Sequence, residues 1–599
     1  MRTIRFILSE YRANLSWFVI GMAALILGSL AQTLVPLYIK LAVDAASPTP
    51  PSNDGFAGKL ALDLIGGARA DMNFVVICLV VVALLSIALG VFTFFKRYYL
   101  VRISRRTEYR LRKAMYARLQ DLPAGYYDNT RSGGIMSLMT SDIEAVRMMI
   151  GPAIMYIGGT IVLFPASLVI MFSLNPLLTG LALVPLIGLT ASTIWFNPRV
   201  RKYSVRSQED LEQLSARAQE NFAGARVVKA FSREQFEIDE LARMGDRYLE
   251  NKLGQARNQS MFQACIWAFS GLGVLIIIYF GALEIAAGRF STGDIAAFIY
   301  YNLNLYWPMI ALGWVTMLFV RADASLKRID AVLTHPVDPS RQPGGFVPAE
   351  LRGDIEFRDV SHRYGPELPY SLHRINVSVR AGKTLGIVGQ VGSGKSTMAN
   401  LLLRLIEPTE GEVLVDGQPL REYDAHALRG FFGYVPQDSF LFSDTIASNI
   451  GLALPEDAPR EAVTQAARLA EFEQEVLGLP KGYDTMLGER GVNLSGGQKQ
   501  RAAIARALAG KPRVLVLDDC LSAVDTDTEE RILRNLKAET RDITTLIIAQ
   551  RISSVQHADE IIVLEAGRII ERGTDAELRA SGGLYAELSR RQELAAELA

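Results

Sequence analysis

The chain has 599 residues, which is too long for a single hydrophobic core and long enough for two or three domains. Half of the residues are hydrophobic and 21% are charged, and the 63 basic and 63 acidic side chains cancel. Because nucleic-acid binders carry a basic surface, this balance predicts a protein with no nucleic-acid partner.

Six apolar stretches before residue 320 are each long enough to cross a lipid bilayer. A transmembrane helix needs about 20 mostly apolar residues, whereas a buried helix of a soluble protein is shorter and has a polar face. No cleavage pattern of a secretory signal precedes the first stretch, so we expect it to be retained. The predicted spans are residues 15–43, 73–95, 149–172, 176–196, 264–287 and 295–319.

The connections between these spans predict how the chain is oriented in the lipid bilayer. Residues 98–147 and 198–263 are long and rich in arginine, whereas residues 44–72, 173–175 and 288–294 carry few cations. Since basic loops stay on the cytoplasmic side, we expect a multi-pass protein of the cytoplasmic (inner) membrane with both termini in the cytosol. The two long loops have helical patterns, so we expect the spans to continue well into the cytosol as helices.

Four polar side chains within the spans have two interpretations. Intramembrane polar groups mark a transport pathway in some proteins. They also form hydrogen bonds between helices or lie at the membrane interface, and this second interpretation is favoured here. A proline at position 308 predicts a kink in the sixth span, because proline removes a helical hydrogen bond. The four polar residues are Gln32, Glu284, Asn302 and Asn304.

The composition changes after residue 333. Residues 334–352 are rich in proline and glycine, which is typical of a linker. From residue 353 onward, strand-like runs such as 384–388 and 513–517 alternate with helical stretches, an α/β pattern. We therefore expect a transmembrane domain over residues 1–333, a linker over 334–352 and a cytosolic α/β domain over 353–590.

One stretch of the α/β domain matches the motif G-x-x-x-x-G-K-[ST] between an apolar run and a helical pattern. Strand, loop and helix in this order are typical of a phosphate-binding loop. Its glycines let backbone N–H groups surround phosphates, and the helix N-terminus adds positive potential. In this interpretation Lys395 reaches the β- and γ-phosphates of ATP, and Ser396 binds Mg²⁺. The predicted ATP-binding residues of the loop are Gly389, Gln390, Val391, Gly392, Ser393, Gly394, Lys395, Ser396 and Thr397.

Two further segments add to this interpretation. Residues 513–517 form an apolar run that ends at Asp518, and an acidic residue at the end of a strand near a phosphate loop can hold the Mg²⁺ shell. Between the two segments lies a sequence in which a serine and glycine amides would form a second anion cradle at a helix start. This sequence is Leu494-Ser495-Gly496-Gly497-Gln498.

LSGGQ resembles the signature motif of the ATP-binding cassette (ABC) exporters, and the resemblance covers nearly the whole chain. It implies a multi-domain protein: an all-α bundle of six transmembrane helices with the ABC type-1 exporter fold, followed by an α/β P-loop nucleotide-binding domain. In that family two nucleotide domains pair head to tail, and the signature motif of each presses on the γ-phosphate held by the other. The resemblance therefore implies a second half-transporter as partner, with ATP and Mg²⁺ as cofactors.

Other positions match the family in the same order. Tyr364 stands where an aromatic ring stacks on adenine, and Gln437 matches the glutamine that touches Mg²⁺ and faces the membrane loops. Residues 488–491 resemble the coupling segment of the exporters, and residues 125–147 and 218–234 resemble the regions around their two coupling loops. The implied dimer-contact loop is Ser522, Ala523, Val524 and Asp525.

Two positions depart from the hydrolytic pattern of the family. Asp519 replaces the glutamate that polarises the attacking water, and Gln550 replaces a histidine that contacts the γ-phosphate. Aspartate is one methylene shorter, and a misplacement of roughly 1 Å can cost about a hundredfold in rate. A neutral amide donates a hydrogen bond but carries no positive charge. The catalytic positions are thus present in degenerate form, and a site that binds ATP well and hydrolyses it slowly is expected.

These features predict ATP-driven export of small amphipathic or hydrophobic cargo, drug-like or lipid-like, across the lipid bilayer. The intact signature motif and the altered hydrolytic residues favour a heterodimer, in which this chain serves the partner's site. One alternative is a homodimeric exporter of lipid or peptide, in which the substitutions are harmless. The other is an ATP-gated regulatory membrane protein that does not pump. A soluble nucleotide switch of nucleic-acid repair is excluded by the spans and the zero net charge.

Overall fold

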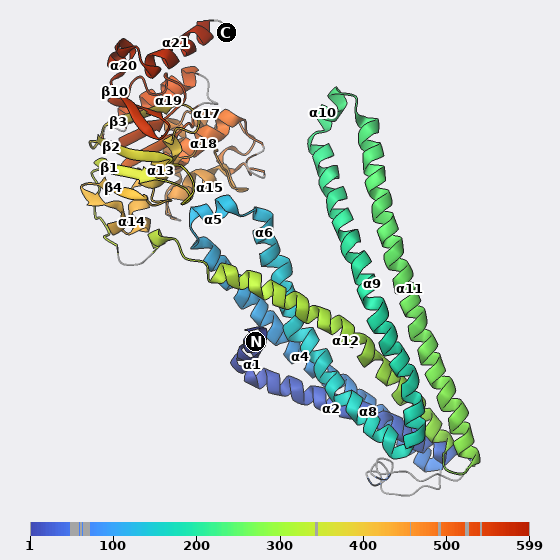
Figure 1. Cartoon of the computed structure of the whole chain (residues 1–599). Coiled ribbons are helices and arrows are strands. Elements are labelled where there is room, and N and C mark those ends of the chain that lie inside the picture. Colours follow the sequence, from blue (N-terminus) through green and yellow to red (C-terminus); the bar gives the residue numbers. More distant parts are fainter. Residues whose placement is uncertain are drawn as a thin grey trace. The chain divides into compact units, whose positions relative to one another are not determined.

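The computed structural model divides the chain into two units (Figure 1). The first comprises Met1–Ala117 and Gly133–Thr334, and the second comprises Arg118–Ser132 and His335–Ala599. The short segment Arg118–Ser132 therefore groups with the α/β unit, although it lies between two helices of the first unit. The structure describes residues 2–47, 59, 63, 72–341, 345–455, 457–488, 491, 493–521, 526–539 and 542–597.

The first unit consists of helices, six of which are long and apolar enough to cross a membrane. Within the described residues these are Leu15–Ala46, Asn73–Gln120, Ser132–Leu174, Pro176–Ala223, Glu234–Ala286 and Thr292–Leu333, and they confirm the six predicted spans. In chain order the helices are α1 (Arg2–Ala13), α2 (Leu15–Ala46), α4 (Met72–Gln120), α6 (Ser132–Ser137), α7 (Ile143–Met148), α8 (Ile154–Leu174), α9 (Pro176–Ala223), α10 (Ala225–Ala230), α11 (Glu234–Ala286) and α12 (Thr292–Leu333). Two π-helical turns, Leu138–Asp142 and Met149–Ala153, join α6, α7 and α8.

Three of these helices are much longer than their apolar stretches. Helices α4, α9 and α11 have 49, 48 and 53 residues, and at 1.5 Å per residue they are roughly 70–80 Å long. A hydrocarbon layer is only about 30 Å thick, so each helix continues far beyond it, as the patterns of the two long loops predicted. Helix α12 likewise runs through Pro308 without ending.

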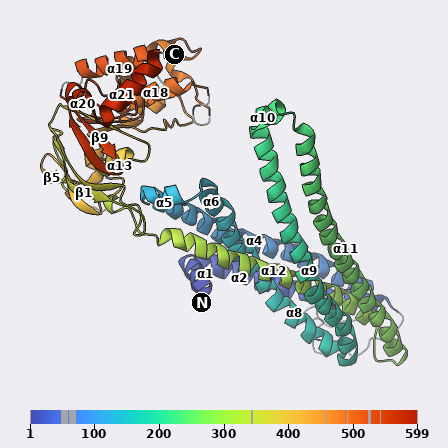
Figure 2. The same cartoon turned by 45° about the horizontal axis from the view of Figure 1, so that its top comes forward.

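Helices α9 and α11 form a long antiparallel hairpin with α10 at its tip (Figures 1 and 2). Both views show the tip standing clear of the other helices of this unit. Large apolar side chains are nevertheless exposed there: Phe222, Val227 and Phe231 are 82%, 60% and 74% exposed. Such a cluster at the end of a long polar hairpin is typical of a surface that another protein covers.

Helices α2 and α12 are joined by buried polar contacts. The Lys40 ammonium lies 2.7 Å from Asp294, and the two side chains are only 0% and 2% exposed. The backbone N–H of Gly293 donates to Asp44 at 2.9 Å. These groups lie where α2 ends and α12 begins, so the charges neutralise one another inside an apolar bundle. The sequence interpretation did not single out these residues.

Some of the four predicted intramembrane polar residues form hydrogen bonds between helices, as one of the two interpretations of the sequence predicted. The Gln32 amide donates to the Asn304 side chain at 3.4 Å, which links α2 to α12. Glu284 pairs with Arg289 at 2.7 Å and accepts a long hydrogen bond from Asn175 at 3.5 Å. Asn302 is buried, 2% exposed.

The second unit contains two β-sheets. The first has the order β2-β1-β4-β5 and is antiparallel; the second has the order β10-β9-β3-β8-β7-β6, in which only β10 is antiparallel to its neighbour. The strands are β1 (Ile355–His362), β2 (Leu372–Val379), β3 (Thr384–Gly389), β4 (Glu410–Val415), β5 (Gln418–Pro419), β6 (Phe432–Val435), β7 (Val514–Asp518), β8 (Thr544–Ile548), β9 (Glu560–Glu565) and β10 (Arg568–Gly573). The helices are α5 (Ala124–Asn129), α13 (Lys395–Leu402), α14 (Ala425–Arg429), α15 (Ile446–Ile450), α16 (Arg460–Leu469), α17 (Glu473–Leu477), α18 (Gly496–Ala509), α19 (Thr526–Glu539), α20 (Asp575–Ser581) and α21 (Leu584–Glu597).

The mainly parallel sheet is buried on both faces, which explains its continuous apolar strands. In β7, Leu515 and Leu517 pack into one apolar cluster with Ile504 of α18, whereas Val514 and Val516 pack into another with β1 and β4. Alternate residues therefore serve opposite faces, as the two-residue period of a strand requires. Strand β8 lies between β3 and β7 and is parallel to both, so the carboxyl ends of β3 and β7 lie at the same edge of the sheet.

The segment that precedes the sheets is tied to Arg118–Ser132 by polar contacts. The Arg118 guanidinium donates to the His335 carbonyl at 2.6 Å, and the backbone N–H of Asp338 donates to the Asp121 carbonyl at 2.9 Å. Arg341 also pairs with Asp121 at 3.1 Å. In the predicted linker, residues 342–344 lie outside the described residues.

Candidate nucleotide-binding site

The phosphate-loop motif lies between β3 and α13, as its sequence context predicted. Gly392 and Gly394 have φ values of +82° and +102°, which non-glycine residues rarely adopt. A Cβ atom at Gly394 would lie 2.4 Å from the Ser371 carbonyl oxygen, so only glycine fits where the loop passes β2. The backbone thus turns sharply before α13 and directs the N-terminus of this helix at the loop.

Lys395 folds back over the loop. Its ammonium donates to the carbonyl oxygens of Gly389 and Gln390, both at 2.8 Å, and the residue is 8% exposed. Burial lowers the pKa of this ammonium, and the nearby carboxylates of Asp519 and Asp518 oppose that change. Because a buried cation needs acceptors, an anion in the loop would give this ammonium a stronger partner than two carbonyls.

The end of β7 lies opposite the start of α13. The Ser396 hydroxyl donates to Asp518 at 3.1 Å. Burial raises the pKa of the Asp518 carboxyl, as does the charge of Asp519, whereas the Ser396 hydrogen bond and Lys395 lower it. A hydroxyl and a carboxylate at this separation are oxygen ligands of the kind that Mg²⁺ prefers.

Both residues predicted as degenerate are in contact with each other. The Gln550 amide donates to Oδ2 of Asp519 at 3.1 Å, and the Gln437 amide reaches the same oxygen at 3.4 Å. Asp519 has a φ of +48°, a conformation that aspartate tolerates better than most residues. Its backbone N–H donates to the Ile548 carbonyl at 2.8 Å, which joins the ends of β7 and β8. One carboxylate oxygen therefore accepts from two neutral amides.

The phosphate loop, the end of β7 and the amides of Gln437 and Gln550 line one cavity of about 280 Å³. Ser371, which the sequence interpretation missed, lines it because the loop passes the start of β2; no motif includes this serine. The Tyr364 hydroxyl lies 3.2 Å from the Thr397 hydroxyl at the rim. Of the predicted ATP-binding residues, Gly389, Gln390 and Ser393 do not line the cavity. The lining residues are Tyr364, Ser371, Val391, Gly392, Gly394, Lys395, Ser396, Thr397, Gln437, Asp518, Asp519 and Gln550.

The signature motif forms the start of α18. The Ser495 hydroxyl accepts from the Gln498 N–H at 3.3 Å, and the Gln498 side chain accepts from the Ser495 N–H at 2.9 Å. This reciprocal capping fixes the helix N-terminus. None of the residues 494–498, all of which the structure describes, lines the cavity. The predicted dimer-contact residues Ser522, Ala523, Val524 and Asp525 lie outside the described residues, as do Glu489 and Arg490 of the coupling segment.

The residues present fit a magnesium-bound nucleoside triphosphate. The buried Ser393 hydroxyl has no hydrogen-bond partner among the described residues, and it lies on the phosphate loop, although it does not line the cavity itself. The Lys395 ammonium supplies positive charge, and Ser396 and Asp518 supply oxygen ligands. The buried Lys395 ammonium, whose acceptors are two neutral carbonyls, would gain a charged partner when a phosphate is bound.

A phosphate loop on a doubly covered α/β sheet, preceded by six membrane-spanning helices, defines a membrane transport ATPase. Comparisons with known proteins agree. Residues 18–309 match the ABC transporter transmembrane region and residues 372–522 match the ABC transporter family. The chain belongs to the ABC transporter family, as an exporter half-transporter, and it is a multi-pass membrane protein.

Individual relatives are similar over most of their lengths. The chain is 37% identical to the uncharacterized ABC transporter ATP-binding protein YknU of Bacillus subtilis, over 83% of this chain and 85% of that protein. It is 34% identical to the probable multidrug resistance protein YheI of the same organism, covering 85% and 87%. It is also 34% identical to the ATP-dependent lipid A-core flippase of Methylococcus capsulatus, covering 89% of each.

A solved structure supports the same fold. The structure of a bacterial Atm1-family ABC exporter with ATP bound superposes with a TM-score of 0.76 at 28% identity, covering 96% of this chain and 98% of that one. The predicted fold class is therefore confirmed, and ATP-driven export is the activity of the family.

Replacing Lys395 with alanine is expected to abolish high-affinity ATP binding. Among the described residues, Lys395 supplies the only ammonium that lines the cavity, so the change leaves the phosphate charge to backbone N–H groups. A hydrogen bond to a charged group contributes about 1.5–3 kcal/mol, so at least tenfold weaker binding is expected. Equilibrium binding of a fluorescent ATP analogue to the purified chain measures the change. Replacing Lys383, an exposed lysine paired with Asp559 outside the cavity, is the control. Unchanged affinity in Lys395→Ala would contradict the assignment.

Proposed function

We propose that this chain is the subunit of a heterodimeric ABC exporter that holds a slowly hydrolysing ATP site and completes the partner's fast site. The observation that carries the proposal is the contact of Asp519 with Gln437 and Gln550. In this arrangement the carboxylate is engaged by two amides and is one methylene shorter than a glutamate.

The binding residues keep the chemistry that nucleotide capture needs. Lys395 neutralises the phosphate charge, the loop amides from Gly389 to Thr397 surround it, and Tyr364 at the rim stacks on the base. Ser396, Asp518 and Gln437 would hold Mg²⁺, which would supply positive charge beside the phosphates. The site therefore retains nucleotide, because nothing in its binding set is altered.

The hydrolytic residues are the altered ones. A general base must be within hydrogen-bond reach of the water it activates, and Asp519 reaches less far than a glutamate while accepting from Gln437 and Gln550. Gln550 can donate to a phosphate oxygen but cannot carry a proton as imidazolium does. ATP bound by this chain's loop is thus a long-lived ligand that keeps the nucleotide domains together.

The intact signature motif explains why a partner is needed. Ser495 and the glycine amides present an ordered helix N-terminus to an anion, yet they lie outside this chain's own cavity. In a head-to-tail pair they reach the γ-phosphate on the partner's loop. A homodimer would have two slow sites, whereas a partner with glutamate and histidine at the matching positions supplies one fast site.

Movement of the nucleotide domains reaches the helices through two cytosolic segments. The segment Arg118–Ser132 is tied to the linker through Arg118, Asp121 and Arg341. The tip of the α9–α11 hairpin exposes Phe222 and Phe231, which we assign to a surface covered by the partner's nucleotide domain. Both termini then lie in the cytosol, and the cargo is an amphipathic solute, the class that the names of the multidrug and lipid A-core relatives suggest.

The test compares the ATPase activity of the purified chain with that of the chain co-expressed with a candidate half-transporter. The candidate carries glutamate and histidine at the matching positions and an altered signature motif. The single chain is expected to turn over ATP at least about a hundredfold more slowly than the pair. Robust turnover by this chain alone would reject the heterodimer and favour a homodimeric exporter. ATP-dependent uptake of an amphipathic dye into inside-out vesicles separates a pump from an ATP-gated regulator.

A further inference from the structure

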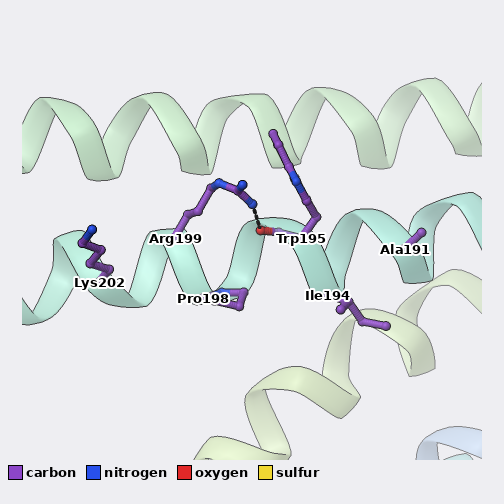
Figure 3. Close-up of a pocket in the computed structure, with 6 residues that line it drawn as sticks. All are labelled: Ala191, Ile194, Trp195, Pro198, Arg199 and Lys202. Carbon is purple, nitrogen blue, oxygen red and sulfur yellow. Dashed lines mark hydrogen bonds between the residues drawn. The ribbon is translucent and has the colours of Figure 1, made fainter.

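Helix α9 carries an open pocket where its apolar stretch changes to a basic one. The pocket has a volume of about 650 Å³. Counted from the first of them, its lining residues lie three, four, seven, eight and eleven positions along the chain, so they share one face of the helix over successive turns. They are Ala191, Ile194, Trp195, Pro198, Arg199 and Lys202 (Figure 3).

The polarity of this face changes along the helix axis. Ala191, Ile194 and Trp195 are apolar, and the last two are 71% and 52% exposed. Arg199 and Lys202 follow one and two turns later. Residues 191 to 202 cover roughly 16 Å of helix. An apolar surface followed by cations, aligned with the axis of a membrane-spanning helix, matches a phospholipid in which the acyl chain lies beside an anionic headgroup.

Trp195 and Arg199 are held together at the change of polarity. The guanidinium lies 3.7 Å from the centre of the indole ring and donates to the Trp195 carbonyl at 2.6 Å, as the dashed line in Figure 3 marks. Pro198 has no N–H group, so it cannot donate to the helix turn that precedes it. Tryptophan at the end of an apolar membrane-spanning stretch is typical of a membrane–water interface. The pair therefore presents a fixed cation at the level of lipid headgroups.

The basic residues that follow the apolar stretch of α9 are closely spaced. Four of them, Arg199, Arg201, Lys202 and Arg206, occur within eight residues. Across the described part of the chain, none of the four forms an ion pair with an acidic residue. Such a run beside a membrane span attracts anionic lipids.

A second run of basic residues, on α4, includes cations that do have carboxylate partners. Arg105 and Arg112 pair with Glu108 at 2.8 and 2.9 Å, and Arg110 pairs with Glu10. These three cations of α4 are therefore paired with carboxylates of the protein itself. The four cations of α9 have no such partner among the described residues, although they also follow an apolar membrane-spanning stretch.

We propose that Trp195, Arg199 and Lys202 form a binding site for an anionic phospholipid, with the headgroup phosphate against the two cations and an acyl chain along Ala191 and Ile194. The occupant is the bilayer's own acidic lipid, because the apolar end of the pocket continues into the membrane-spanning stretch of α9. The site is separate from the nucleotide cavity and does not depend on which subunit hydrolyses ATP.

The test uses phospholipids with brominated acyl chains, which quench nearby tryptophan. The full transporter in neutral detergent is titrated with brominated phosphatidylglycerol or phosphatidylcholine. The Trp195 contribution is the emission lost in Trp195→Phe. The expected result is a roughly 25-fold lower midpoint for phosphatidylglycerol. This corresponds to two cations at about 1 kcal/mol each, converted at about 1.4 kcal/mol per tenfold.

Variants then locate the headgroup contact. The double variant Arg199→Gln/Lys202→Gln is expected to bind both lipids equally, and the charge-keeping variant Arg199→Lys/Lys202→Arg is expected to retain the preference within about twofold. The control Arg243→Gln/Lys252→Gln removes two exposed cations from α11 of the same hairpin and is expected to change nothing.

Three results would overturn the proposal. The first is equal midpoints for the two lipids in the unaltered protein. The second is a full preference for phosphatidylglycerol in Arg199→Gln/Lys202→Gln. The third is displacement of the lipid by free glycerol phosphate at the concentration at which phosphatidylglycerol itself binds, which would make the pocket a site for soluble anions.

Discussion

Replacing Asp519 with glutamate and Gln550 with histidine is expected to raise hydrolysis at this chain's own site by roughly a hundredfold. Glutamate extends the carboxylate by one methylene, and a general base placed within reach of its water contributes about 10²–10⁴ in rate. Histidine removes one of the two amides that donate to Asp519 and adds a group that can carry positive charge. The measurement is the steady-state ATPase rate of the purified variant chain.

The two substitutions are expected to be non-additive, because residues 519 and 550 are in direct contact. Each single variant should gain less than tenfold, since one altered group remains beside the corrected one. Adding Lys395→Ala to the double variant is the control and should abolish the gain, which assigns it to this chain's own phosphate loop. If the double variant hydrolyses ATP no faster than the unaltered chain, the slow-site proposal is wrong.

Replacing Lys40 with methionine is expected to destabilise the transmembrane unit by about 3–5 kcal/mol, because removing one partner of a buried ion pair leaves a buried charge uncompensated. The Lys40 and Asp294 side chains are 0% and 2% exposed, and Asp44 lies nearby, accepting from Gly293. The Asp294 carboxylate is almost completely buried, so water has little access to it and cannot replace the lysine. The midpoint of unfolding of the detergent-solubilised protein in sodium dodecyl sulfate measures the change.

A second substitution and a surface pair control this prediction. Asp294→Asn in the Lys40→Met background should recover more than half of the loss, because it removes the uncompensated charge and keeps an acceptor for the Ser291 N–H. Lys327 forms an exposed ion pair with Asp323 at 2.9 Å, and Lys327→Met should cost under about 1 kcal/mol. Equal losses in Lys40→Met and Lys327→Met would show that the buried pair does not hold α2 to α12.

Local features of the sequence were sufficient for most of the architecture. Six apolar stretches of membrane-spanning length became six long helices, since hydrophobic length is a property of consecutive residues. The loop from Gly389 to Thr397 could likewise be predicted as a phosphate loop, because its glycines and lysine act through the backbone immediately around them. The order of the strands around this loop could not be predicted from the sequence, because it depends on how the whole domain folds.

The contacts at the site and in the bundle depended on packing. Asp519 and Gln550 could each be recognised as substitutions. Nothing in the sequence shows that Gln550 donates a hydrogen bond to Asp519, or that Gln437 donates to the same carboxylate oxygen. Lys40 looks like a cation at the end of a span, where lysine usually extends to the interface. Its burial against Asp294 followed only from the packing of α2 on α12.

The sequence by itself determined the membrane spans, the phosphate loop and the signature motif, because each depends on residues that are neighbours along the chain. Only the tertiary structure decided which cations have partners on other helices: Lys40 is neutralised by Asp294, Arg110 by Glu10, and Lys202 by no carboxylate of the described residues. Charge neutralisation depends on distance in space. That distance is set by how helices far apart in the sequence pack together.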